Sequence, residues 1–270
     1  MKSRAGPGSS SIGNACLPYP KTAIYRLGDK EFMHSNTDTH REKNCIIFFI
    51  KAPVAGLVKT RLAEHAGIQG ALCLYRAFVE DILLTLKGSG IDIRIYFYPG
   101  KDENLVARWL GHDTQLFAQE GTDLGLRMYN AFRQSASDGY DNMVLVGSDI
   151  PHLSEKIIVD AFSGLSNNHA VIGPAMDGGY YLIGFSKRTL SGDAFTNITW
   201  SRPDVFEKTL HRLNNNNQRV YMLPPLHDID TWEDLCVLAS SLAEHPTATP
   251  THTQKLIHTR RVLSDIKMLF

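Results

Sequence analysis

The chain has 270 residues, of which 43% are hydrophobic and 21% are charged, and its Lys and Arg residues balance its Asp and Glu residues at 28 each. This composition is typical of a soluble globular protein with room for one large α/β domain, and a formal net charge of zero offers no general attraction to nucleic acid or to an anionic membrane. No apolar run approaches the roughly 18 residues of a membrane span, and Met1–Cys16 has no apolar signal core, so we expect a cytoplasmic protein without nucleic-acid or membrane partners.

Residues 1–44 show no sustained hydrophobic period and are rich in Gly, Ser and polar side chains. We predict a poorly ordered N-terminal extension there. The first regular element is a strand at 45–50, an unbroken apolar run of the kind that is buried on both faces of a parallel sheet.

A loop with Pro, Gly and three cations, Lys51, Lys59 and Arg61, follows this strand. Backbone N–H groups and positive charge at the carboxyl edge of a sheet are typical of phosphate-binding loops, although an ordinary loop with solvated lysines fits the local pattern equally well. The glycines of a Walker A loop are missing, and no Gly-x-Gly-x-x-Gly follows a predicted strand.

Strands and helices alternate along the rest of the chain. We predict strands at 91–98, 115–119, 143–146, 171–174, 180–185 and 220–223, and helices at 67–86, 104–110, 123–136, 154–162, 201–214, from 231 onward and at 254–269. This order predicts an α/β protein, a three-layer α/β/α sandwich with a mixed, mostly parallel sheet. The main domain is expected at 45–245, with a linker and a C-terminal helix at 246–270.

Asp149 directly follows the predicted strand at 143–146, and Pro151 turns the chain away after it. Its carboxylate is therefore expected to face the same crevice as the basic loop. An acid beside a cationic phosphate loop indicates a divalent cation between carboxylates and phosphates, and Mg²⁺ is commonly held in this way. The alternative is an Asx-turn ahead of the helix that Ser154 caps.

Asp228 and Asp230 form a second acidic group, after the strand at 220–223 and just before the helix cap at Thr231. For Asp230 a stabilising position ahead of a helix N-terminus is a strong alternative to a metal ligand. This alternative explains Asp228 less well, because Asp228 lies three residues before the Thr231 cap.

Asp177, Gly178, Gly179 and Tyr180 join two predicted strands. Asp-Gly between apolar runs is first a hairpin signal, while two glycines also permit a ligand to approach the backbone. Gly121 and Thr122 precede a predicted helix, where they could lie against a base or simply form a turn.

Five segments taken together resemble the DUF2064 family, whose fold is similar to that of the glycosyltransferase-A, nucleotide-diphospho-sugar transferase group. They are Lys-Ala-Pro-x-x-Gly-x-Val-Lys-Thr-Arg-Leu-Ala at 51–63, Gly-x-Asp-Leu-Gly at 121–125, Gly-Ser-Asp-Ile-Pro at 147–151, Gly-Pro-Ala-x-Asp-Gly-Gly-Tyr-x-Leu-Ile-Gly at 173–184 and Asp-Ile-Asp-Thr at 228–231. The resemblance covers residues 45–242 and departs at Ala55, where the family usually has Pro. The first segment is also similar to that of phospholactate guanylyltransferases.

The resemblance implies roles for several positions of these segments. It places the triphosphate on Lys59 and Arg61, the base near Gly121 and Thr122, and Mg²⁺ or Mn²⁺ on Asp149 and Asp228. We further expect Lys51, Ala52, Gly56 and Ser148 among the nucleotide contacts, Asp230 as a third metal ligand, the acceptor on Asp177, Gly178, Gly179 and Tyr180, and Lys59, Arg61 and Asp149 as the catalytic residues.

Three functions remain open from the sequence. The first is nucleotidyl transfer from a nucleoside triphosphate to a small phosphorylated or hydroxyl acceptor, because three cations and a metal match the charge on departing pyrophosphate. The second is glycosyl transfer from a nucleotide sugar. The third is a nucleotide-sensing or interaction protein without turnover. The base, the acceptor and the oligomeric state do not follow from the sequence.

Overall fold

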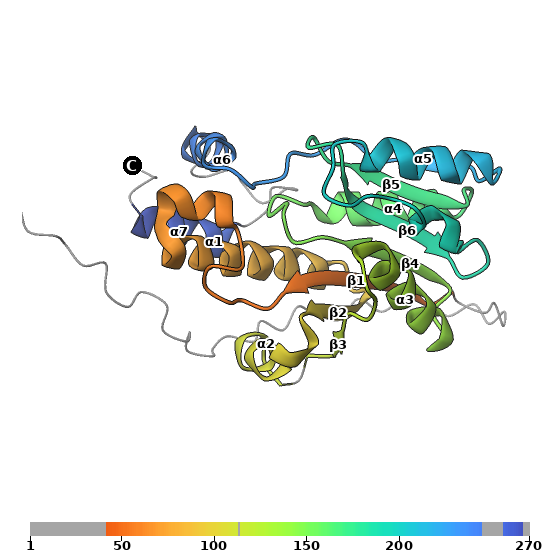
Figure 1. Ribbon diagram of the computed structural model, residues 1–270, viewed down its shortest axis with the longest axis horizontal. Helices are drawn as coiled ribbons and strands as arrows, with labels where there is room; N and C mark the ends of the chain where they lie inside the picture. Colours follow the sequence, from red (N-terminus) through yellow and green to blue (C-terminus); the bar gives the residue numbers. More distant parts are fainter. Residues whose placement is uncertain (1–41, 113, 245–255, 267–270) are drawn as a thin grey trace, which may run out of the picture. The chain divides into compact units, whose positions relative to one another are not determined.

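The computed structural model describes residues 42–112, 114–244 and 256–266. Seven strands form one sheet in the order β3-β2-β1-β4-β6-β5-β7 (Figure 1). The strands are β1 Asn44–Lys51, β2 Asp92–Tyr98, β3 Leu116–Ala118, β4 Asn142–Val146, β5 Ala170–Pro174, β6 Tyr180–Ser186 and β7 Val220–Met222.

Only β6 runs against the other strands. It pairs antiparallel with β4 and β5, whereas β1, β2, β3 and β4 pair parallel with one another and β7 pairs parallel with β5. The carboxyl ends of the other six strands therefore lie along one edge of the sheet. The predicted fold class, a mixed and mostly parallel α/β sandwich, is confirmed.

Helices cover both faces of the sheet. They are α1 Thr60–Gly88, α2 Glu103–Leu110, α3 Leu124–Ser137, α4 Glu155–Leu165, α5 Val205–Asn215, α6 Trp232–Glu244 and α7 Ile257–Asp265. Short 3₁₀ helices lie at η1 Gly100–Asp102 and η2 Gly192–Phe195.

Alternate residues of β1 reach the two sides of the sheet. Ile46 and Phe48 belong to a core cluster that includes α1, α2 and α4, and Ile47 and Phe49 belong to another that includes α3, η2 and α5. All four side chains are at most 7% exposed, as expected for a strand in the middle of a parallel sheet. The central position predicted for the strand at 45–50 is thus confirmed.

A third apolar layer lies on the side of α1 that faces away from the sheet. Leu74 and Phe78 of α1 pack there with Leu238 of α6 and Leu263 of α7. The start of α7 is attached to α1 through Asp81, whose carboxylate accepts hydrogen bonds from the backbone N–H groups at 258 and 259 at 3.0 and 2.8 Å.

The boundaries of α1 differ from the prediction. The helix begins at Thr60, and Gly67, the predicted start, is a non-helical residue within it with φ 71° and ψ 163°. A left-handed φ is readily adopted by glycine, so Gly67 kinks the helix without steric cost. Most of the predicted extension at 1–44 and the predicted linker at 247–253 lie outside the described residues.

None of the described helices is long and apolar enough to cross a membrane.

Candidate functional site

The two acidic loops meet at the carboxyl edge of the sheet. Asp149 lies three residues after the end of β4, and Asp228 to Asp230 precede α6. The backbone N–H of Ile229 donates to the backbone oxygen of Asp149 at 2.9 Å. This hydrogen bond joins the loops, so the acids predicted from distant segments are brought together.

Lys59 lies between the carboxylates. Its Nζ donates to Asp149 Oδ1 at 2.5 Å, to Asp230 Oδ1 at 2.6 Å and to the backbone oxygen of Ile229 at 2.8 Å. These bonds use the three protons of the ammonium group, and the side chain is 3% exposed. Lys59 also has a left-handed backbone, φ 46° and ψ 49°, at the N-cap of α1. The sequence indicated Lys59 as a phosphate ligand; here it joins the acids.

The charges of this cluster stabilise each other. Burial lowers the pKa of the Lys59 ammonium, but the charges of Asp149 and Asp230 outweigh that effect and hold it above the ordinary value. Loss of solvation raises the pKa of Asp149, and the charge and hydrogen bond of Lys59, with a further contribution from Lys51, bring it below the usual range. Lys59 and Asp149 are thus ionised partners at neutral pH.

Asp228 has no such partner. It is 9% exposed, and within the described residues no Lys or Arg forms an ion pair with it. Burial, together with the charges of Asp177, Asp230 and Asp149, raises the pKa of Asp228 to about 6. The site therefore holds more negative charge than Lys59 neutralises, which is what a bound cation would relieve.

The donor set fits a divalent cation that prefers oxygen. Asp149, Asp228 and Asp230 offer carboxylate oxygens, the ligands that suit Mg²⁺ and Mn²⁺. In the part of the chain that the structure describes, no three His, Cys, Asp or Glu side chains already form a metal site. Lys59 bridges two of the three carboxylates instead.

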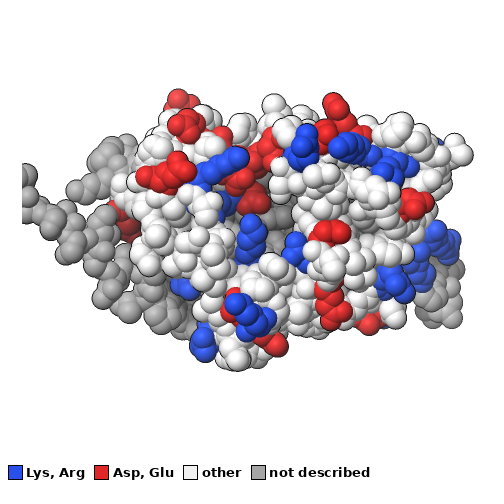
Figure 2. Space-filling model, in the orientation of Figure 1, with Lys and Arg blue, Asp and Glu red and all other residues white. Residues whose placement is uncertain are grey.

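Lys51 and Arg61 are exposed near this cluster, at the end of β1 and in the first turn of α1. In Figure 2 acidic and basic side chains lie side by side near the middle of the face, between the regions of α1 and β5. The backbone of Lys51 is held by Tyr75, whose hydroxyl accepts from the Lys51 N–H at 2.7 Å and donates to the Lys51 oxygen at 2.9 Å. Tyr75 thus fixes the end of β1 next to the acids.

Two of the predicted nucleotide contacts are buried. Ala52 is 3% exposed, and its N–H donates to the backbone oxygen of Tyr98 at 2.7 Å. Ser148 is 7% exposed and its side chain interacts with the Tyr75 hydroxyl. Both residues hold the loops around the site in this structure.

Gly56 and Gly121 have left-handed backbones, with φ 79° and 145°. A Cβ at Gly121 would also lie 2.8 Å from the backbone nitrogen of Arg127 in α3, so only glycine fits there. Gly121 and Thr122 are exposed beyond the end of β3. Within the described residues no hydrogen bond or ion pair joins them to the acids, and they lie beyond a different strand of the same sheet edge.

The segment 175–179 is a hairpin turn, as its Asp-Gly pair indicated. Asp177 Oδ1 accepts from the Gly179 N–H at 2.8 Å, and the Ala175 N–H donates to the Gly179 oxygen at 3.1 Å. A Cβ on Gly178, with φ 89°, would lie 2.0 Å from the Pro203 oxygen, so packing already requires glycine. The Tyr180 hydroxyl lies 3.9 Å from Met128 Sδ of α3, and burial raises its pKa.

Two residues near the site gave no signal in the sequence. Tyr75 fits the apolar face of α1, so the role of its hydroxyl could not be inferred. His152 follows Pro151, and burial together with the charge of His227 lowers its pKa to about 4. Its Nδ1 has no hydrogen-bond partner among the described residues.

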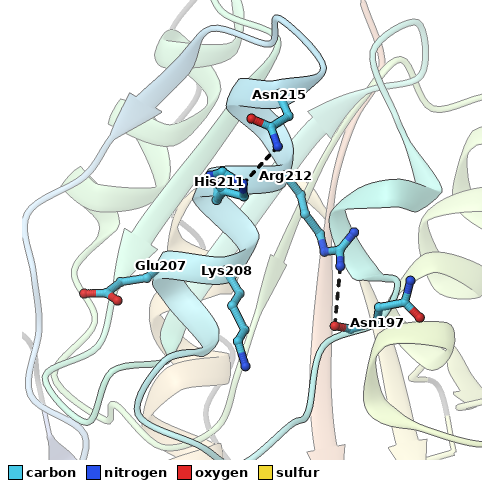
Figure 3. Close-up of a pocket in the computed structure, with 6 residues that line it drawn as sticks. All are labelled: Asn197, Glu207, Lys208, His211, Arg212 and Asn215. Atoms are coloured by element: carbon cyan, nitrogen blue, oxygen red, sulfur yellow. Dashed lines mark hydrogen bonds between the residues drawn. The ribbon is translucent and has the colours of Figure 1, made fainter.

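A separate pocket lies along α5 (Figure 3). It is lined by Asn197, Glu207, Lys208, His211, Arg212 and Asn215. Two internal hydrogen bonds cross its lining, from Arg212 to the Asn197 oxygen at 3.5 Å and between Asn215 and His211 at 3.0 Å. None of the site residues predicted from the sequence lines this pocket.

Comparison with known proteins agrees with the fold and the motifs. The family described as "Uncharacterized protein conserved in bacteria (DUF2064)" matches residues 83–202. A protein from Desulfovibrio desulfuricans G20, provisionally described as a nucleotide-diphospho-sugar transferase, has a solved structure with a TM-score of 0.77 and 37% identity over 84% of this chain and 96% of that chain. No curated protein matches the chain.

More distant solved structures share the fold alone. A cytidylyltransferase from Leptospira borgpetersenii serovar Hardjo-bovis (strain JB197) has a TM-score of 0.52 at 14% identity, over 85% of this chain and 97% of that one. A 4-diphosphocytidyl-2C-methyl-D-erythritol synthase from Anaerococcus prevotii DSM 20548 has a TM-score of 0.51 at 13% identity, over 74% and 98%.

The sheet, its strand order and the relative with 37% identity define a protein of the nucleotide-diphospho-sugar transferase superfamily. Within that superfamily, the chain belongs to the DUF2064 family.

Proposed function

We propose that this protein is a metal-dependent nucleotidyltransferase, which moves a nucleotidyl group from a nucleoside triphosphate to a small acceptor that carries a phosphate or hydroxyl group. The observation that carries the proposal is the cluster of Lys59, Asp149 and Asp230, with Asp228 beside it, at the carboxyl edge of the sheet. Ligands of open α/β sheets bind at this edge.

The exposed cations are suited to the leaving group. Lys51 and Arg61 have no ion pair among the described residues, so their charges are available to the β- and γ-phosphates. When the acceptor oxygen bonds to the α-phosphorus, the bond to the bridging oxygen breaks and pyrophosphate departs with the negative charge. Positive groups fixed beforehand at that position stabilise the transition state more than water does.

Asp149, Asp228 and Asp230 would hold Mg²⁺ or Mn²⁺. The ion, when bound, supplies positive charge next to the phosphates. Lys59 pairs with Asp149 and Asp230 before any ligand arrives and keeps Asp149 ionised. We assign it, together with Arg61, as a catalytic cation for the phosphates. Asp228, whose charge is least compensated, is the acid with the most to gain from the ion.

We assign the acceptor to the turn between β5 and β6. Asp177 is exposed there and its charge raises the pKa of Asp228, so the turn lies close to the carboxylates proposed to hold the metal. Asp177 and the backbone of Gly178 and Gly179 would orient the acceptor. Tyr180, the first residue of β6, would support the turn through its contact with Met128 of α3. On the opposite side, Gly121 and Thr122 would lie near the base and Ser148, Ala52 and Gly56 would shape the phosphate loop.

Glycosyl transfer from a nucleotide sugar is the second candidate. It is favoured by the description of the relative from Desulfovibrio desulfuricans G20 as a nucleotide-diphospho-sugar transferase. In that reaction a nucleoside diphosphate leaves, so the cations would contact a shorter phosphate chain.

Product analysis separates these candidates. The protein is incubated with MgCl₂ and each nucleoside triphosphate, or each of a panel of nucleotide sugars, together with mixed phosphate monoesters and sugars as acceptors. Release of pyrophosphate from one triphosphate supports the proposal. Release of a nucleoside diphosphate from a nucleotide sugar contradicts it in favour of glycosyl transfer, and release of neither contradicts both in favour of a binding protein.

A further inference from the structure

Tyr98 presents an exposed aromatic ring at the carboxyl edge of the sheet. It is the last residue of β2 and pairs in register with Lys51 of β1. Its backbone oxygen accepts from the Ala52 N–H at 2.7 Å, so the loop that carries the cations starts beside it. The residue is 44% exposed. A large aromatic side chain thus lies next to the proposed phosphate loop and is open to solvent.

Packing alone does not account for this ring. Tyr96, two residues earlier and on the same face of β2, is 2% exposed, stacks on Phe117 at 5.0 Å between ring centroids and donates its hydroxyl to Gln134 at 3.0 Å. Tyr96 shows how this strand buries a tyrosine within the core. Tyr98 continues the same row of side chains beyond the core, at the exposed end of the strand.

Arg127 holds the ring of Tyr98 in place. Its guanidinium carbon lies 4.2 Å from the centroid of the ring, a cation–π contact that covers one face. Arg127 Nε is buried and has no hydrogen-bond partner among the described residues, so the ring is the contact that orients this side chain. The exposure that Tyr98 retains therefore belongs to the rest of its surface.

The same arginine adjoins the glycine loop. The backbone nitrogen of Arg127 lies within 2.8 Å of where a Cβ of Gly121 would stand, and its N–H donates to the Asp123 oxygen at 3.1 Å. Lys51, Tyr98, Arg127 and Gly121 thus form a continuous strip along the ends of β1, β2 and β3. The strip runs from Lys51, a proposed phosphate contact, to Gly121, which has no side chain.

We infer that Tyr98 is the stacking platform for the nucleobase of the donor nucleotide and that Arg127 is the positioning residue that fixes its ring. This inference rests on the proposed function, because it extends the same site from the phosphates to the base. An aromatic ring supported by a cation offers a flat surface to any base, since every base has a π face. The platform therefore contributes affinity, and hydrogen bonds from neighbouring groups select the base.

Calorimetric titration with two kinds of probe tests the inference. ATP, GTP, CTP and UTP, each with MgCl₂, carry a base; inorganic tripolyphosphate with MgCl₂ carries the same phosphates without one. In Tyr98→Ala we expect affinity for every triphosphate that binds the wild type to fall at least about fivefold, the lower end of a base–aromatic stack. Affinity for tripolyphosphate should stay within twofold, and Tyr98→Phe should bind triphosphates like the wild type.

Two further variants complete the design. Arg127→Met should weaken triphosphate binding less than Tyr98→Ala does, again without effect on tripolyphosphate. Tyr221→Ala is the matched control, because Tyr221 is 40% exposed on β7, at the opposite end of the strand order. It should leave both probes unaffected, and the thermal midpoints of all variants report whether they fold.

The outcomes separate the inference from the function beneath it. The stacking role of Tyr98 is wrong if Tyr98→Ala folds and binds triphosphates as the wild type does. It is also wrong if the variant loses as much affinity for tripolyphosphate as for triphosphates. Neither result contradicts the proposed phosphate site. If the wild type binds neither a triphosphate nor tripolyphosphate, the proposed function itself is wrong.

Discussion

Two buried carboxylates of this protein have opposite surroundings. Asp81, 1% exposed in α1, accepts two backbone N–H groups from the start of α7. Asp228, 9% exposed at the sheet edge, is surrounded by Asp177, Asp230 and Asp149. Burial raises the pKa of both carboxyls, but hydrogen bonds from Thr259 and His258 oppose the rise at Asp81, while the neighbouring acids add to it at Asp228.

The difference is the one expected between a carboxylate that stabilises the fold and a carboxylate of the proposed binding site. A buried carboxylate with donors around it fastens two helices together. A buried carboxylate among other carboxylates reduces the stability of the fold, and such groups concentrate at binding and catalytic sites. Changes in the acidic cluster should therefore alter ligand binding, and changes at Asp81 should alter stability alone.

The largest effect on stability is expected from Lys59→Met. The variant keeps the length of the side chain but leaves Asp149 and Asp230 facing each other without their cation. Breaking a buried ion pair costs about 3–5 kcal/mol, and because these carboxylates are 53% and 38% exposed we expect a loss of about 2–3 kcal/mol. Urea denaturation measures it.

Magnesium provides the second readout for this variant. Because the freed carboxylates lack a counter-charge, MgCl₂ should stabilise Lys59→Met more than it stabilises the wild type. Lys156→Met, which breaks an exposed pair with Asp160 in α4, is the control and should leave the stability and its magnesium dependence as in the wild type. Equal effects of magnesium on Lys59→Met and on the wild type would contradict the metal site.

Asp81→Ala should have the next largest effect. It leaves two backbone N–H groups at the start of α7 without an acceptor, which costs about 1–3 kcal/mol. Urea denaturation measures the loss, and calorimetry should find triphosphate binding unchanged. Asp81→Asn keeps one acceptor oxygen and should lose less. A variant that lost binding while keeping its stability would break the distinction between the two carboxylates.

His152 gives the smallest effect, and it depends on pH. Its pKa is about 4 in the folded protein and 6.5 in the unfolded chain. Between these pH values the unfolded chain binds a proton that the folded chain does not. Stability therefore falls as the pH falls, and His152 contributes a loss of up to about 2 kcal/mol between pH 7 and pH 5.

His152→Gln should remove this part of the pH dependence, as measured by urea denaturation at both pH values. The exposed His112, replaced in the same way, is the control and should leave the dependence unchanged. If His152→Gln and the wild type lost the same stability on acidification, the low pKa of His152 would be wrong.

Much of the fold could be predicted because its signals are local. The apolar run that became β1, the Asp-Gly turn before β6 and the Ser154 cap of α4 each depend on neighbouring residues, and each is confirmed. The kink at Gly67 was visible as a helix boundary, but the turns of α1 before it were not, because they pack against α6 and α7 from the far end of the chain.

The site could be predicted only in part, because several of its contacts join residues that are far apart in the sequence. The acids were expected to meet because parallel strands end at one edge. The phosphate role predicted for Lys59 stays a prediction; its hydrogen bonds to Asp149 and Asp230, which lie 90 and 171 positions away, were not predicted. No residue near Lys59 in the sequence indicates such distant partners. Tyr75 fits the apolar spacing of α1, so its hydrogen bonds to Lys51 could not be predicted either.

The most direct test of the central claim is thermal unfolding of the wild type and of Asp149→Ala with each nucleoside triphosphate, with and without MgCl₂. Asp160→Ala, from the exposed pair in α4, is the control. A ligand that binds only the folded state raises the midpoint by mass action. We predict a magnesium-dependent rise with at least one triphosphate in the wild type and in Asp160→Ala, and none in Asp149→Ala. A rise of equal size in Asp149→Ala, or one that does not need magnesium, would contradict the account.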